Sequence, residues 1–315
     1  MSTCSTVSRD LDEPISGTAA TASTWLLLEQ PGPWGAKALT SSHLDPAVGR
    51  ALEAAAHGTG VRVALIRRPG RHADCGTPSE RQVYAAHTVP GGTWLHSATT
   101  RDPRELLDLD FAALGRGEHR TFDSMLDGRP HTGDPLALVC TNGKRDRCCA
   151  LLGRPLAAEL AASGVEGVWE VTHLGGHRFS PTLLVLPYGY AYGRAEAHAV
   201  KEILHSAQEG RIVTEGCRGC SAWERPGQAA ELAVRRAARE DAADVLSIVR
   251  TEGAAPRWEV TVAHTDGRRW RVVVAQGASL PPRPETCGTS VLGSPARMDV
   301  VAVRETTAAA TALAG

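Results

Sequence analysis

The sequence predicts an α/β fold made of two similar halves and a smaller C-terminal region. Strand-like apolar runs alternate with segments of helical periodicity between residues 24 and 209. The order β-α-β-(β)β-α occurs once before and once after a polar, turn-rich stretch at 115–135. The chain of 315 residues has the length of about two domains, since one domain usually holds roughly 100–200 residues.

The first half is expected to span residues 23–116. It follows a small, polar stretch, residues 1–22, that we expect to be a flexible N-terminus. The helix at 45–58 has a proline just inside its start and a glycine at its end, the usual asymmetry of helix termini. A Pro-Gly-Gly turn at 90–92 predicts a hairpin. The expected elements, in order, are strand 24–29, helix 45–58, strand 60–67, hairpin strands 81–89 and 93–99, and helix 103–115.

The second half is expected to span residues 133–210 and to repeat this order. A charged loop follows its first strand, and a loop with two histidines follows its second. We therefore infer a structural pseudo-repeat of two small α/β units. The expected elements are strand 136–141, helix 152–164, strand 168–172, strand 182–187 and helix 194–209.

The remaining residues, 211–315, predict a helix and a β-hairpin. A loop at 211–222 contains a C-x-x-C, and an Ala- and Arg-rich helical pattern follows at 226–250. Two alternating apolar runs then flank Thr-Asp-Gly, which is a strong hairpin signal. Residues 298–305 read as one further strand.

Charge and composition bear on the partners of this chain. Its 34 basic and 35 acidic side chains nearly cancel, so we expect neither a nucleic-acid nor a membrane partner. No apolar run approaches the roughly 18 residues that span a bilayer, and the N-terminus lacks the basic start and apolar core of a secretory signal. We therefore expect a cytoplasmic protein.

The eight cysteines are not expected to form structural disulfides in a reducing cytosol. Clustered cysteines in that compartment are better interpreted as metal ligands or redox thiols. Isolated cysteines usually serve as small hydrophobic side chains, and we expect this of Cys4, Cys75, Cys217 and Cys287.

Two pairs of candidate ligands follow two strands of the second half. Cys140 and Cys149 are nine positions apart, and His173 and His177 are four apart. The cysteine spacing is too long for the C-x₂₋₄-C knuckle of most structural zinc sites and suits something larger than one ion. Two adjacent glycines between the histidines disfavour a helix and fit a backbone that passes close to a ligand. These observations favour an iron–sulfur centre held by two thiolates and two imidazoles.

Three other interpretations remain open. The same four residues could form a structural Cys₂His₂ zinc site in an interaction protein. They could also be ordinary loop histidines and a buried cysteine. A third class is a thiol–disulfide oxidoreductase that uses Cys217 and Cys220, because a C-x-x-C dithiol lowers the pKa of its attacking thiol when it begins a helix.

Several motifs resemble those of a known family. They are W-L-L-L-E-Q-P-G-P-W-G at 25–35, C-T-N-G-K-R-D-R-C-C at 140–149, W-E-V-T-H-L-G-G-H-R-F at 169–179, P-Y-G-Y-A-Y-G-R at 187–194 and R-P-G-Q-A-A-E-L-A at 225–233. In this order they resemble the sucrase/ferredoxin-like proteins, over most of residues 15–240.

The resemblance implies a thioredoxin-like ferredoxin domain that binds one 2Fe–2S cluster, and we place it at 133–210. The repeated order of elements makes 23–116 a similar half without a cluster, because only the second half bears the candidate ligands. By the same resemblance Cys140 and Cys149 bind one iron, and His173 and His177 bind the other. Cys148 could replace Cys149 as a ligand, but the nine-residue step favours Cys149.

Such a site predicts a redox role with unidentified redox partner proteins, as a carrier or an oxidoreductase component. Two ferric ions, two sulfides and two thiolates carry no net charge when the histidines are neutral, so reduction is easier than in an all-cysteine cluster. Histidine ligation raises potentials to roughly −150 to +300 mV, against about −400 mV for plant-type ferredoxins. An iron-bound imidazole can also lose its second N–H proton, so we expect proton-coupled electron transfer.

The charged residues of these loops bear on the reduction potential and on a hydrolytic activity. Lys144, Arg145 and Arg147 would favour the reduced form electrostatically, unless they are only the solvated side chains of a polar loop. Sucrose hydrolysis finds no support, because glycoside hydrolysis needs two opposed carboxylates and these loops contain no such acidic pair.

Overall fold

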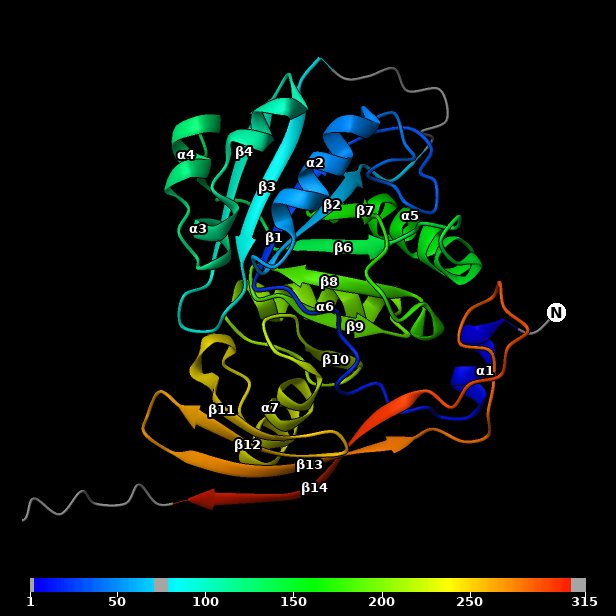
Figure 1. Ribbon diagram of the computed structural model, residues 1–315, viewed down its shortest axis with the longest axis vertical. Helices are drawn as coiled ribbons and strands as arrows, with labels where there is room; N and C mark the ends of the chain where they lie inside the picture. The colour runs from blue at the N-terminus through cyan, green and yellow to red at the C-terminus, as the bar shows by residue number, and fades with distance from the viewer. Residues whose placement is uncertain (1–2, 71–78, 307–315) are drawn as a thin grey trace, which may run out of the picture.

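The computed structural model of the chain describes residues 3–70 and 79–306. Cys75, one of the cysteines expected to be isolated, lies outside these residues. A ten-stranded mixed sheet with helices against it forms the larger part of the molecule, and a four-stranded antiparallel sheet lies beside it (Figure 1). The predicted α/β class is confirmed. Over residues 3–70 and 79–306, no helix has the length and apolar character needed to cross a membrane.

The first half contains the predicted strands and a more broken set of helices. Asp45 caps the helix α2 by accepting a hydrogen bond from the backbone of Ala47. The helix expected at 103–115 is split, because Asp110 starts a new helix by accepting from Ala113. The elements are β1 (Thr24–Glu29), α2 (Pro46–Ala56), β2 (Val61–Arg67), β3 (Arg81–His87), β4 (Trp94–Thr100), η1 (Pro103–Asp108), α3 (Phe111–Gly115), α4 (Arg120–Leu126) and β5 (Arg129–Pro130). The last two lie in the stretch expected to be a linker.

The second half follows its predicted order and adds one strand, β9. Its strands are buried along their length, because helices or the other half cover both faces. The elements are β6 (Leu136–Cys140), a π-helical turn η2 (Cys149–Gly153), α5 (Arg154–Ala162), β7 (Val168–Val171), η3 (His177–Phe179), β8 (Thr182–Leu186), β9 (Tyr190–Gly193) and α6 (Ala197–Gln208).

The two halves have the same sheet topology, which supports the inferred pseudo-repeat. The strand order is β2-β1-β3-β4 in the first half and β7-β6-β8-β9 in the second. In each half the first two strands are parallel and the other pairs are antiparallel. The halves join where β2 pairs with β7, at Ile66 with Val171 and Arg67 with Glu170. The proposed boundaries at 23–116 and 133–210 stay a prediction, although strands of both segments share one sheet.

One apolar core is common to both halves. Residues of β1, β2 and β3 pack in the same cluster as residues of β6, β7 and β8. The rings of Tyr84 and Trp169, one from each half, meet edge to face at 5.8 Å between centroids. Cys140 and Cys149 belong to this shared core. The candidate ligands therefore lie where the two halves meet.

The C-terminal region contains more β-strands and a shorter helix than the sequence predicted. Its helix α7 (Arg225–Ala238) ends at Arg239, which takes a left-handed conformation, and not at residue 250. Residues from Leu246 onward form a strand because they pair with β12 and bury apolar side chains against α7. The sheet consists of β11 (Leu246–Ala254), β12 (Arg257–His264), β13 (Arg269–Ala278) and β14 (Ala296–Thr306). The C-x-x-C, expected in a loop, forms the edge strand β10 (Cys217–Cys220).

The N-terminal stretch also differs from expectation. Residues that we expected to be a flexible N-terminus form the helix α1 (Cys4–Asp10), whose first turn is capped by the side chain of Thr3. Cys4 and Ser8 are buried, and Ser5 donates a hydrogen bond to the carbonyl of Ser180. Small polar side chains do not mark a free tail here, because they fit into a close contact with the second half.

Candidate metal centre

Two neighbouring parallel strands carry the candidate ligands to one place. Cys140 is the last residue of β6, and its partner in the register is Val171, the last residue of β7. His173 follows two residues later. Because parallel strands end on the same edge of a sheet, Cys140 and His173 start from adjacent strand ends.

The loop after β6 turns back so that Cys149 returns to Cys140. The side-chain oxygen of Asn142 accepts hydrogen bonds from the backbones of Lys144 and Arg145, which forms a tight turn. The π-helical turn η2 then starts at Cys149. A Cβ at Gly153 would lie 2.1 Å from the carbonyl oxygen of Cys140, so only glycine allows this close approach.

Cys140, Cys149 and His173 form one group that can hold a metal ion. Their ligand atoms all lie within 4.8 Å of one another, and both cysteines are buried. His177 is not part of this group, but its ring lies 5.4 Å from the ring of His173, centroid to centroid. The structure thus brings three of the four predicted ligands together and places the fourth beside them.

Each histidine has an unpaired nitrogen in the interior. The Nδ1 atoms of His173 and His177 are buried and have no hydrogen-bond partner among residues 3–70 and 79–306. A buried polar atom without a partner costs roughly 1–3 kcal/mol, and a bound metal ion would supply the partner that these two nitrogens lack. Two thiols and two unpaired imidazole nitrogens fit a centre that contains a soft or borderline metal.

The histidine loop has the conformation that its two glycines predict. Gly175 and Gly176 have φ angles of +82° and +69°, in the left-handed region, so this segment is not a helix. A Cβ on Gly176 would lie 2.0 Å from a guanidinium nitrogen of Arg218. The close neighbour of Gly176 is thus the side chain of Arg218, and the expected approach of this backbone to a ligand stays a prediction.

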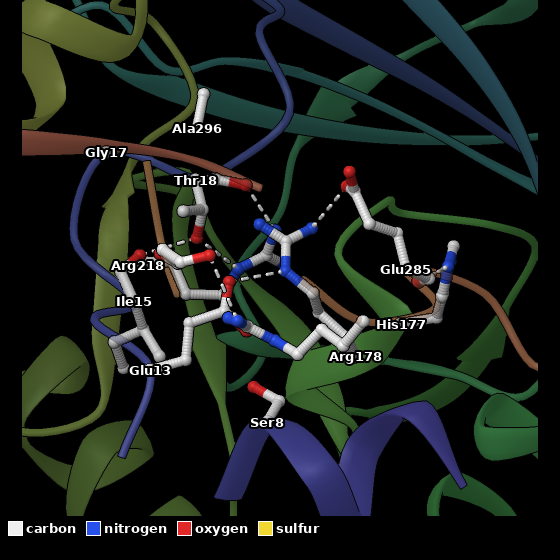
Figure 2. A network of polar contacts seen from close by, with 12 residues as sticks. Ser8, Glu13, Ile15, Gly17, Thr18, His177, Arg178, Arg218, Glu285 and Ala296 are labelled. Atoms are coloured by element: carbon white, nitrogen blue, oxygen red, sulfur yellow. Dashed lines mark hydrogen bonds and ion pairs between the residues drawn. The ribbon is translucent and has the colours of Figure 1, made fainter. Parts of the chain in front are cut away.

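Two arginines, Arg178 and Arg218, hold the loop through ion pairs and hydrogen bonds. Figure 2 shows Arg178, the neighbour of His177, between Glu13 and Glu285. Its guanidinium donates to Glu13 at 2.8 Å and lies 3.7 Å from Glu285. Arg218 donates to the carbonyl of Gly175 at 3.1 Å and to both oxygens of Thr18. The N-terminal segment therefore holds the histidine loop in place.

Electrostatic interactions favour a thiolate at Cys140. A hydrogen bond with Cys149, together with contact to His173, holds the pKa of the Cys140 thiol well below its usual range, although burial opposes this. The same hydrogen bond and burial raise the pKa of Cys149. One proton shared by two sulfurs is the usual behaviour of such close pairs.

Two arginines that the sequence did not single out interact with this thiolate. Arg62 donates to the carbonyl of His173 at 2.9 Å, and both Arg62 and Arg218 attract the charge of Cys140. Burial, with repulsion from Arg178, lowers the pKa of Arg218 to about 10, so it stays protonated at neutral pH. By contrast Lys144, Arg145 and Arg147 are exposed, as in a solvated polar loop.

The second nitrogen of His177 has two oxygen partners. Its Nε2 lies 2.9 Å from the carbonyl oxygen of Glu285 and 3.5 Å from a carboxylate oxygen of Asp146. Burial lowers the pKa of His177, although the charge of Asp146 opposes this. A neutral His177 with its proton on Nε2 can donate to Glu285 and direct Nδ1 inward.

The C-x-x-C lacks the environment of a reactive dithiol. Both of its cysteines are fully buried in β10. Burial raises the pKa of Cys217 to about 12 and that of Cys220 well above its usual range. A thiolate nucleophile is therefore disfavoured at neutral pH.

A second group of possible ligands was not foreseen from the sequence. Cys4, Asp146, Cys148 and Cys287 have ligand atoms within 4.8 Å of one another. Two of these cysteines were expected to be isolated hydrophobic side chains. Their only shared signal is the residue type, because no regular spacing links positions this far apart in the chain.

Comparison with known protein families identifies the family of this chain. The family model described as sucrase/ferredoxin-like matches residues 15–219, which is more than half of the chain and includes Cys140, Cys149, His173 and His177. Cys4 and Cys287 lie outside the matched segment. Searches of curated proteins and of solved structures each found no match.

Proposed function

Because this chain belongs to the sucrase/ferredoxin-like family, we propose that it is an electron-transfer protein with one 2Fe–2S cluster. Cys140 and Cys149 would bind one iron, and His173 and His177 the other. Such a cluster, when bound, supplies reversible one-electron chemistry. Its donor proteins and acceptors would be redox proteins that dock near the histidine loop, where both histidines are partly exposed.

The observation that carries this proposal is the set of donor atoms at the ends of β6 and β7. Two thiols and His173 lie within 4.8 Å of one another, and the buried Nδ1 atoms of both histidines have no partner in the described part of the chain. A zinc site would use the same donors. The loop of eight residues between the two cysteines and the family resemblance favour the larger group.

The surrounding residues favour a comparatively high reduction potential. Neutral imidazoles add no negative charge, and the guanidiniums of Arg62 and Arg218 attract the charge of Cys140. Fixed positive charges in an interior of low dielectric constant favour the state with one more electron. We therefore expect a potential in the range of histidine-ligated clusters.

The histidines would couple electron transfer to a proton. If Nδ1 of His177 binds metal, its Nε2 holds a proton that donates to the carbonyl of Glu285 at 2.9 Å. Release of this proton is easier when the metal is ferric. The potential should then fall with rising pH, by up to about 59 mV per pH unit for one proton per electron.

Metal analysis tests the proposal most directly. Protein purified anaerobically should be brown and contain about two irons and about two acid-labile sulfides per chain. His173→Ala and His177→Ala should lose the visible spectrum, whereas His57→Ala, on an exposed histidine, should keep it. A colourless protein whose Cys140 site holds zinc would contradict the proposal.

Potentials measured between about pH 6 and about pH 9 test the proton coupling. A constant potential over this range would contradict the proposed proton coupling, which is the main consequence of histidine ligation. Cys217→Ser and Cys220→Ser distinguish electron transfer by a cluster from the alternative function, thiol–disulfide exchange. Loss of redox activity in these variants, with His173→Ala still active, would favour a thiol–disulfide oxidoreductase.

A further inference from the structure

Three cysteines from distant parts of the chain meet beside the candidate centre. The Sγ atom of Cys4 lies 3.4 Å from that of Cys148 and 3.5 Å from that of Cys287, and Cys148 lies 3.2 Å from Cys287. The three sulfurs thus form a nearly equilateral triangle. Cys4 belongs to α1, Cys148 precedes η2, and Cys287 lies in the loop between β13 and β14, which Figure 1 shows beside α1.

A buried carboxylate completes this group. The side chain of Asp146 is 1% exposed, and one of its oxygens lies 3.9 Å from the sulfur of Cys4. The backbone N–H groups of Cys148 and Cys287 donate to its two oxygens at 2.9 and 3.0 Å. These bonds orient the carboxylate and the two cysteines toward the same point.

Packing alone does not account for such an arrangement. A cysteine that serves as a small hydrophobic side chain contacts apolar groups, whereas these sulfurs contact one another and a carboxylate. Their separations exceed the bonded S–S length of about 2.05 Å, and the described part of the chain has them as free thiols. A disulfide between two of them would leave the third without a function.

We propose that Cys4, Cys148, Cys287 and Asp146 bind one zinc ion, at a site separate from the iron–sulfur centre proposed above. Zinc prefers four ligands in a tetrahedron and accepts thiolate sulfur and carboxylate oxygen. On binding, each thiol releases its proton to the solvent, and the three thiolates and one carboxylate then surround the divalent ion. All four positions are filled by protein, so the site is structural.

The ion would connect three segments that are far apart in the sequence. Cys4 and Cys287 are separated by 283 positions, and Cys148 is adjacent in sequence to Cys149 of the proposed cluster. The same loop that carries Cys287 also provides the Glu285 carbonyl to His177. Zinc would therefore hold α1 and this loop against His177, at one side of the centre.

Zinc and iron contents of the full chain, expressed with both metals and purified anaerobically, test the proposal. We expect about one zinc per chain besides the iron. Cys4→Ser and Cys287→Ser should each lower the zinc content at least about tenfold. The iron content should persist in both variants, which separates failure of this proposal from failure of the proposed function. Cys217→Ser, at a buried cysteine in β10, is the matched control and should keep both metals.

Cobalt(II) provides a second readout. Cobalt in place of zinc should give intense visible bands of a tetrahedral thiolate site in the wild-type chain, and these should be absent in Cys287→Ser. Cys287 is partly exposed, so its serine variant should fold. The proposal is overturned if the wild-type chain binds neither zinc nor cobalt under reducing conditions, or if both variants keep their zinc. Mass spectrometry that finds a disulfide between any two of these cysteines in the anaerobic protein would also overturn it.

Discussion

The two halves of the sheet have one topology but different chemistry at their strand ends. The last register pair of β1 and β2 is Glu29 with Ile66, and that of β6 and β7 is Cys140 with Val171. Glu29 thus occupies the place that Cys140 has in the second half. Its carboxylate accepts a hydrogen bond from the backbone of Gln82 at 3.0 Å.

The strand ends of the first half are closed by protein groups. Trp34 donates to the carbonyl of Gln30, and the guanidinium of Arg67 stacks on its ring at 4.1 Å. Arg67 also donates to the carbonyl of Gly32 and pairs with Glu170. In the second half, by contrast, the buried Nδ1 atoms of His173 and His177 lack a partner within the described ranges. Topology therefore fixes where a site can lie, and residue chemistry decides whether one exists.

The largest expected effect is a loss of iron when Cys140, but not the equivalent Glu29, is substituted. Cys140→Ser should remove nearly all iron and labile sulfide, because a serine hydroxyl is a poor ligand for iron in such a cluster. Glu29→Gln, at the matching place in the first half, should leave both contents unchanged, since glutamine can still accept from Gln82. Equal iron loss in both variants would show that the halves are not functionally distinct.

The next largest effect is a loss of stability when the ion pair at the junction between the halves is broken. Arg67 and Glu170 pair at 2.7 Å with side chains only 7% and 5% exposed. Arg67→Met leaves a buried carboxylate without its partner and should lower the free energy of unfolding by about 3–5 kcal/mol in urea titrations. Arg116→Met breaks the exposed pair with Glu118 and should cost at most about 1 kcal/mol. Similar losses in both variants would mean that the junction contributes no more than a surface contact.

Two glycines with positive φ, one in each half, allow the cost of a close contact to be compared with the cost of the backbone conformation alone. Gly176→Ala places a Cβ in the left-handed region and against buried Arg218, and should destabilise by about 3 kcal/mol. Gly91→Ala lies in the β3–β4 hairpin of the first half, with φ of +84°. Apart from its chain neighbours, none of the described residues has an atom within 4 Å of the added Cβ. It should cost only about 1–2 kcal/mol. Thermal or urea unfolding measures both, and equal costs would exclude a role for the contact with Arg218.

The smallest effect is a pH dependence from the first half. His87 is buried beside Thr24, at 2.8 Å, and burial lowers its pKa below the unfolded value of about 6.5. Below that pH the unfolded chain binds more protons, so the free energy of unfolding should fall as pH decreases toward the folded pKa. The slope is at most about 1.4 kcal/mol per pH unit.

His87→Gln should flatten this acid dependence, and His57→Gln, at an exposed position, should not. Urea titrations at several pH values between about 5 and about 7 measure both slopes. An unchanged slope in His87→Gln would assign the acid sensitivity to other groups.

Much of the fold could be predicted because its signals are local. Apolar runs, turn residues and helix caps placed β1, β2, β6, β7 and β8 within a residue or two. The predictions failed where a local pattern competes with tertiary pairing. The helical pattern at 226–250 continues past Arg239, but residues from Leu246 pair with β12 and form a strand instead. Residue type and spacing along the chain were enough to single out Cys140, Cys149 and His173, which the fold brings together.

The sequence by itself determined most strands of the two halves, their repeated order and the residue types of the four candidate ligands, since each depends on neighbours along the chain. Only the tertiary structure decided which cysteine lies beside Cys140, because Cys149 and Cys148 are adjacent and point to different groups. It also placed Arg218 beneath the histidine loop and brought Cys4 to Cys287. These contacts join residues tens to hundreds of positions apart, and they depend on how the packed sheets and loops meet in space.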